Sequence, residues 1–127
     1  MESSGEKILN ASVTIDNRVI FTSYVPEVVS ACDVGLGNSN LYILNIFDGS
    51  PAQDYEDDDE EEEDNEEQDF FTKTDRKKEL VIPGISAPPS IIFPGSEEIE
   101  VMVGTEHAGS IPIEFIRRLY WSEIPDF

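Results

Sequence analysis

The chain has 127 residues, a length typical of a single domain, and its formal charge is −20 at pH 7. Its largest basic cluster is Arg76-Lys77-Lys78. Binding to a phosphate backbone requires clustered Lys and Arg side chains, so the composition argues against nucleic-acid binding. No apolar stretch approaches the ~18 residues that cross a bilayer, which predicts no membrane span.

The N-terminal stretch MESSGEKILN has neither the basic region nor the apolar region of a secretory signal. If Met1 is the true start, the sequence therefore predicts a cytoplasmic protein.

The first part of the chain has the apolar pattern of β-strands. Lys7–Ile15 alternates apolar and polar residues, and Arg18–Val25 is rich in β-branched and aromatic residues. Asp16-Asn17 between them tolerates positive φ, which predicts a tight hairpin turn. Residues 27–40 contain glycine and asparagine, so we expect a loop there.

The remaining strands are expected on both sides of an acidic insertion. Leu41–Ile46 is almost entirely apolar, which predicts a strand buried on both faces, and Asp-Gly then predicts a turn. Order is expected to resume at Glu79–Gly84. Further strands are predicted at Ser90–Phe93, Glu98–Gly104 and Glu114–Ile124, with residues 105–112 as a loop.

The insertion spans residues 51–78 and contains the acidic run from Asp54 to Asp69. Thirteen of the sixteen residues of the run are Asp or Glu, and without them the formal charge changes from −20 to about −7. A highly charged segment with few apolar residues cannot offset the entropy lost on ordering. We therefore expect a disordered or loosely ordered acidic insertion.

About seven short strands and no clear helix predict an all-β fold, an antiparallel meander. Without the 28-residue insertion, 99 residues remain, enough for about two β-propeller blades of roughly 40–50 residues each. Two blades cannot close a ring. Residues 1–127 would then be either a small single β-domain or a propeller fragment that belongs to a larger structure.

Short elements in a fixed order also carry a resemblance to a known family. In the first half these are Gly5-Glu6-Lys7, Phe-Thr-x-Tyr-x-Pro at Phe21–Pro26, Cys-x-x-Gly at Cys32–Gly35 and Leu-Tyr-x-Leu at Leu41–Leu44. In the second half they are GISAPPSIIF at Gly84–Phe93, VMVGT at Val101–Thr105 and RRLYWSEI at Arg117–Ile124. Together they resemble the C-terminal part of the β-propeller in the PilY-type family of type IV pilus assembly proteins and tip-associated adhesins.

The resemblance implies a quinoprotein-like propeller segment with a non-enzymatic role in pilus (fimbrium) assembly and cell adhesion. It implies a place at the cell surface, on the pilus or in the periplasm. The implied partners are other propeller blades or pilus proteins, and a host surface. The family's signal peptide and N-terminal adhesive region are missing, so we expect a fragment, a split gene product or a truncated relative. Asn45 stands where the family commonly has Asp.

The acidic run is the candidate for calcium binding, since calcium takes six to eight oxygen ligands. The family's EF-hand-like loop has the pattern Asp-x-Asp-x-Asp-Gly, whereas no glycine occurs between Asp54 and Asp69. We therefore assign no metal site and no cofactor, and expect a solvated loop. A docking tract for a basic protein remains open.

Candidate chemical groups are few. Cys32 and His107 are the single cysteine and histidine, and no family signature surrounds either, so no catalytic residue is assigned and we expect no enzyme. Glu98, Glu100 and Glu106 with His107 lack the spacing of a transition-metal site.

Tyr120-Trp121 suggests either a sugar or adhesin contact or an aromatic strand that closes a sheet, of which we expect the second. The sequence thus gives two functional hypotheses. One is the pilus propeller segment. The other is a free-standing acidic β-domain that binds calcium or a basic protein partner.

Overall fold

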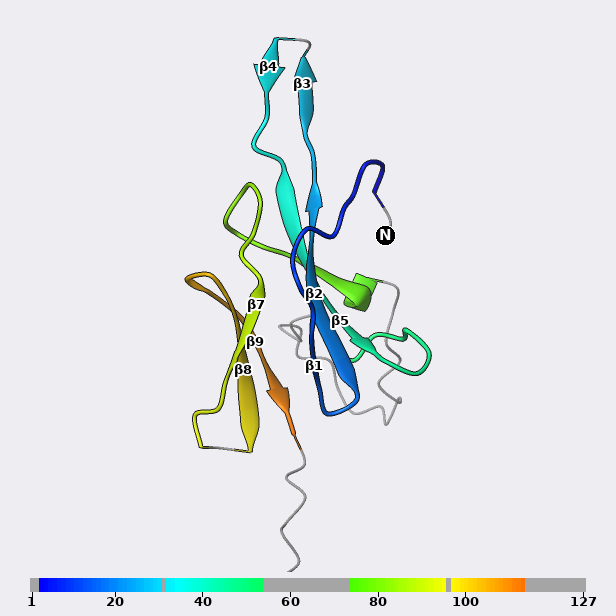
Figure 1. Ribbon diagram of the computed structural model, residues 1–127, viewed down its shortest axis with the longest axis vertical. Helices are drawn as coiled ribbons and strands as arrows, with labels where there is room; N and C mark the ends of the chain where they lie inside the picture. Colours follow the sequence, from blue (N-terminus) through cyan, green and yellow to red (C-terminus); the bar gives the residue numbers. More distant parts are fainter. Residues whose placement is uncertain (1–2, 31, 54–73, 96, 114–127) are drawn as a thin grey trace, which may run out of the picture.

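The computed structural model describes residues 3–30, 32–53, 74–95 and 97–113. Within these ranges every strand pairing is antiparallel, which confirms the all-β prediction (Figure 1). The elements are β1 Val13–Ile15, β2 Arg18–Val25, β3 Val28–Ser30, β4 Asp33–Val34, β5 Asn38–Asn45, the 3-10 helix η1 Thr74–Arg76, β6 Lys77–Glu79, β7 Pro89–Ile92, β8 Glu98–Val103 and β9 Glu106–Pro112.

The described strands form three sheets. The first sheet has the order β1-β2-β5-β6, a four-stranded meander, and the second has the order β7-β8-β9. The third consists only of β3 and β4, a hairpin inserted between β2 and β5. Figure 1 shows this hairpin extending beyond the end of the first sheet.

One apolar core joins the first and second sheets. Alternation along β2 and β5 points Ile20, Leu41 and Ile43 to one face of the first sheet, where all three are fully buried. Ile99 and Val101 on β8 are equally buried and belong to the same core. Burial of these apolar side chains is the main force that holds the two sheets together.

Three side chains that precede the second sheet in the sequence also bond to the outer edge of β9. Lys78 Nζ donates to the Ala108 carbonyl at 3.0 Å, and Gln53 Nε2 donates to the Ser110 carbonyl at 3.1 Å. Arg18 Nη1 lies 3.3 Å from the Pro112 carbonyl. Because these are alternate carbonyls of one strand, side chains occupy the positions where a further strand would pair.

The segment that connects the sheets is held on the first sheet by polar side chains. Ser39 Oγ donates to the Gly84 carbonyl at 2.6 Å, and Asn10 Nδ2 donates to the Ser86 carbonyl at 2.6 Å. These bonds satisfy backbone groups of a segment without its own ladder.

Two predicted loops contain strands. Residues 27–40 hold β3, β4 and the start of β5, and residues 105–112 hold β9. Gly109 and Ser110 have low strand propensity, but pairing with β8 and the burial of Ala108 and Ile111 override it. Turn-forming residues alone therefore predict loops wrongly in both segments, because pairing between strands orders them.

Two other boundaries differ from the predictions. Lys7–Ile15 forms a ladder only at Val13–Ile15, plus one bridge from Lys7 to Tyr24. The proposed insertion is ordered at its described ends. Pro51 forms an isolated β-bridge with Leu44, and strand β6 (Lys77–Glu79) pairs with β5. The acidic run and the predicted strand at 114–124 lie outside the described residues.

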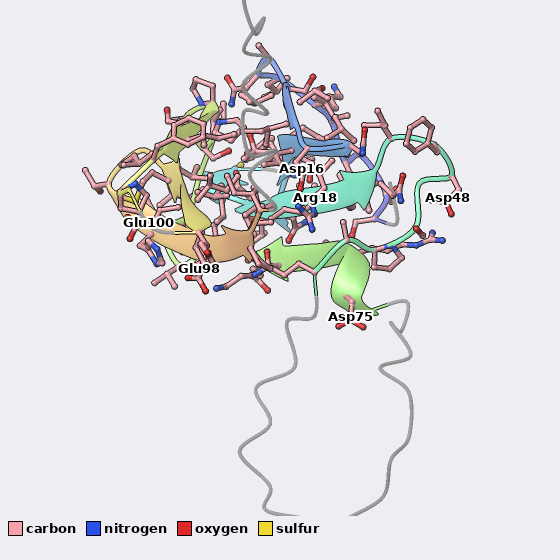
Figure 2. All side chains as sticks on the ribbon, turned by 90° about the horizontal axis from the view of Figure 1, so that it is seen from below. Asp16, Arg18, Asp48, Asp75, Glu98 and Glu100 are labelled. Atoms are coloured by element: carbon pink, nitrogen blue, oxygen red, sulfur yellow. The ribbon has the colours of Figure 1, made fainter. Side chains whose placement is uncertain are left out.

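The predicted turn at Asp16-Asn17 is confirmed, since these residues have φ of 47° and 59°. The predicted Asp-Gly turn after β5 places Gly49 at φ 69°. Here Asp48 Oδ1 accepts bonds from Ser50 Oγ at 2.7 Å and from Ser50 N at 2.9 Å. Figure 2 shows Asp48 projecting outward on the opposite side of the molecule from Glu98 and Glu100.

Substitution Ser50→Ala is expected to raise the pKa of Asp48. In the folded chain the Ser50 hydroxyl, followed by the Ser50 amide, holds this pKa below its ordinary value of 3.8. Because this pKa is lower in the folded chain than in the unfolded chain, the ionised carboxylate stabilises the fold at pH values above the unfolded-state pKa. The contribution is lost as the pH falls through the folded-state pKa. An NMR titration of the Asp48 carboxyl tests this, and an identical pKa in the variant would contradict the assigned cause.

Substitution Gly37→Ala is expected to destabilise the fold by about 2 kcal/mol. Gly37 has φ 69°, and an added Cβ would lie 2.5 Å from the Val25 carbonyl oxygen. Gly49 is the matched control, because it has the same φ of 69° but nothing within 4 Å of an added Cβ. Urea unfolding should show a clearly smaller loss for Gly49→Ala, and equal losses would refute the clash.

Candidate functional site

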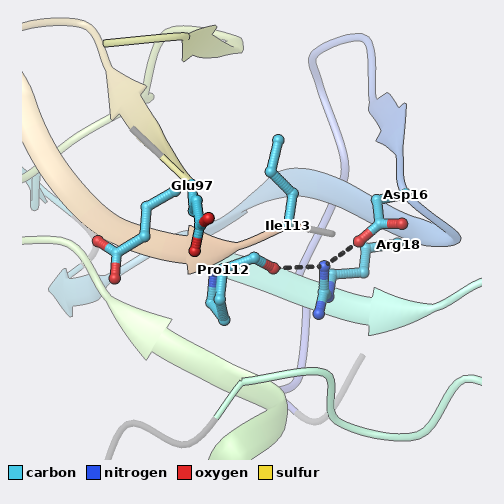
Figure 3. Close-up of a pocket in the computed structure, with 6 residues that line it drawn as sticks. Asp16, Arg18, Glu97, Pro112 and Ile113 are labelled. Atoms are coloured by element: carbon cyan, nitrogen blue, oxygen red, sulfur yellow. Dashed lines mark hydrogen bonds and ion pairs between the residues drawn. The ribbon is translucent and has the colours of Figure 1, made fainter. Parts of the chain in front are cut away.

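A pocket of about 480 Å³ lies where the β1–β2 turn meets the start of β8 and the end of β9. It is positioned by both large sheets, since the turn belongs to the first and β8 and β9 to the second. Figure 3 shows the side chains that surround it. Its lining residues are Asp16, Arg18, Glu97, Glu98, Pro112 and Ile113.

Arg18 is the single basic residue among the described residues of the lining. Its Nη1 atom lies 2.8 Å from Asp16 Oδ2 and 3.3 Å from the Pro112 carbonyl oxygen, as the dashed lines in Figure 3 indicate. Both side chains of the ion pair are partly exposed, so the pair stabilises the fold by only about 0–1 kcal/mol. Its main effect is to fix the guanidinium between the two sheets.

Among the described residues that line the pocket, three carry a carboxylate, namely Asp16, Glu97 and Glu98, and one carries a guanidinium. Such a lining favours a cationic group over an anionic one. In the described part of the chain, no Ser, Thr, Cys, His or Lys lines the pocket.

The other sequence candidates lie apart or have structural partners. The Glu106 carboxylate accepts hydrogen bonds from two backbone amides. Val81 N lies 3.0 Å from Oε1, and Ile82 N lies 3.3 Å from Oε2. Cys32 is exposed in the β3–β4 hairpin, whereas His107 lies on β9 of another sheet. Among the residues that the structure describes, no three His, Cys, Asp or Glu side chains are grouped to hold a metal ion.

One polar cluster was missed by sequence reasoning. Glu6 is buried, and its Oε1 atom accepts bonds from Ser23 Oγ at 2.5 Å, Tyr42 OH at 2.6 Å and Asn40 Nδ2 at 3.5 Å. Its Oε2 atom accepts a bond from Ser3 N at 3.1 Å. The cluster ties the N-terminal segment to β2 and β5. Tyr42 also stacks on Phe21, with ring centroids 4.9 Å apart.

Comparisons with family models, with curated proteins and with solved structures find no match to this chain. Tyr120, Trp121 and the acidic run lie outside the described part of the chain. Within that part, no helix has the length and apolar character needed to cross a membrane.

Proposed function

We propose that this chain is a non-enzymatic structural segment of a β-propeller in a type IV pilus assembly and attachment factor. The observation that supports this best is the first sheet, a four-stranded antiparallel meander in the order β1-β2-β5-β6. This is the strand arrangement of a propeller blade. The second sheet contributes three further meander strands, and the two sheets pack through one core.

The resemblance elements lie at positions that support the same proposal. Glu6 of Gly5-Glu6-Lys7 is the buried carboxylate of the polar cluster, and Leu41–Leu44 lies in the central strand β5. Gly84–Ser86 is the segment held on the first sheet by Ser39 and Asn10. Each of these elements therefore either lies in the first sheet or is bonded to it.

In this function the chain supplies a stiff scaffold, and its activity consists of contacts with other blades, pilus proteins or a host surface. The proposed location is the pilus or the cell surface.

Deleting the coding region in the organism that encodes the chain tests the proposal. Surface pilin and attachment should fall, and expression of the intact chain should restore both. Immunoblots of sheared surface pilin measure the first effect. Unchanged piliation and attachment in the deletion strain would contradict the proposed function.

A second candidate function is an acidic β-domain that binds calcium or a basic protein. The formal charge of −20 and the carboxylates of Asp16 and Glu97 among the described residues of the pocket favour it. This function predicts a melting temperature that rises strongly in millimolar calcium, because a ligand that binds only the folded state stabilises it. The propeller function predicts little change.

A further inference from the structure

The β3–β4 hairpin exposes apolar side chains that nothing in the described chain covers. Val28 is 89% exposed, Val29 is 55% exposed, and Leu36 just after the hairpin is 69% exposed. An isolated two-stranded hairpin is only marginally stable in water. These side chains lie outside the core that the two larger sheets share, and they contribute nothing to it.

The hairpin also has backbone groups available for pairing. In the described residues β3 and β4 pair only with each other, so no third strand covers either outer edge. The outer edge of β9 differs, because side chains occupy its carbonyls at Ala108, Ser110 and Pro112. An uncovered edge beside apolar side chains is the arrangement that strand addition uses.

Charge indicates the kind of strand that fits. Glu27 immediately precedes β3 and is exposed, and its carboxylate lies beside Gly35 near the base of β4. The chain as a whole carries a formal charge of −20. Two copies would therefore repel each other, whereas a strand with Lys or Arg would be attracted.

We propose that the β3–β4 hairpin is a docking site for an extended strand of a partner protein in which apolar residues alternate with Lys or Arg. The partner strand pairs with an edge of the hairpin and covers Val28 and Val29. This surface extends past the end of the first sheet, away from the faces on which blades would pack (Figure 1). The proposal therefore holds whether or not the chain serves in a pilus.

The test measures binding of a fluorescent eight-residue peptide of alternating valine and lysine to the intact chain by anisotropy. The double substitution Val28→Ser and Val29→Ser should weaken binding by at least about tenfold, from the lost apolar burial. It preserves every charge, so attraction to the acidic run is the same in both proteins. Leu36→Ser provides a second variant, also expected to weaken binding.

The matched control is Phe47→Ser, because Phe47 is 78% exposed but follows the opposite end of β5. It should leave binding unchanged, and a valine–glutamate peptide should not bind the wild-type chain. The proposal is overturned if the wild-type chain does not bind the valine–lysine peptide or if the serine variants bind it equally well. It is also overturned if ultracentrifugation shows self-association that the double substitution abolishes, since the occupant is then a second copy.

Discussion

Substitution Ile43→Ala is expected to lower the free energy of unfolding by about 2–5 kcal/mol. Ile43 on β5 is fully buried in the core that the first and second sheets share. Removing its side-chain atoms leaves a cavity between the sheets, and the loss of packing acts on both. Ile99→Ala on β8 should cost a similar amount, because Ile99 is equally buried in that core.

Urea unfolding followed by circular dichroism measures the loss, and hydrogen exchange measures how far it extends. Both substitutions should speed exchange of amides in β2 and in β8. The control is Val81→Ala, since Val81 is exposed and should change the free energy by less than about 0.5 kcal/mol. If Ile43→Ala affects only the first sheet, the two sheets do not form one cooperative unit.

Substitution Glu6→Ala is expected to cost about 2–4 kcal/mol. It removes the acceptor of the Ser23 and Tyr42 hydroxyls at a buried position and leaves both without this partner. It also removes the side-chain bonds from Glu6 to β2 and β5, while the backbone bridge from Lys7 to Tyr24 remains. Thermal and urea unfolding measure the loss.

Two variants sharpen this prediction. Glu6→Gln retains one side-chain oxygen as an acceptor, so it should lose less stability than Glu6→Ala. Glu27→Ala removes an exposed glutamate and should be nearly neutral. Equal effects of Glu6→Ala and Glu27→Ala would show that the buried bonds of Glu6 contribute no stability.

The fold class was predictable because its signal is local. Alternation and β-branched residues marked β2 and β8, and Asp16-Asn17 marked the turn between β1 and β2. Strand β9 was not predictable, because its residues have weak propensity and only pairing with β8 orders them. The short strand β6 depends in the same way on its partner β5.

The polar sites were less predictable than the fold. Nothing local shows that Glu6 is buried, because its partners Ser23 and Tyr42 lie far along the chain. The pocket likewise depends on Arg18 of the first sheet lying beside Pro112 of the second sheet. Such juxtapositions depend on how the sheets pack, which periodicity does not encode.

The most direct test of the proposed propeller role is complementation of a broken ring. A propeller of the pilus family, truncated before its last two blades, would be co-expressed with this chain and analysed by size-exclusion chromatography. We expect a one-to-one complex that melts at a higher temperature than either part. Separate elution of the two parts, with unchanged melting temperatures, would contradict the role of this chain as a ring segment.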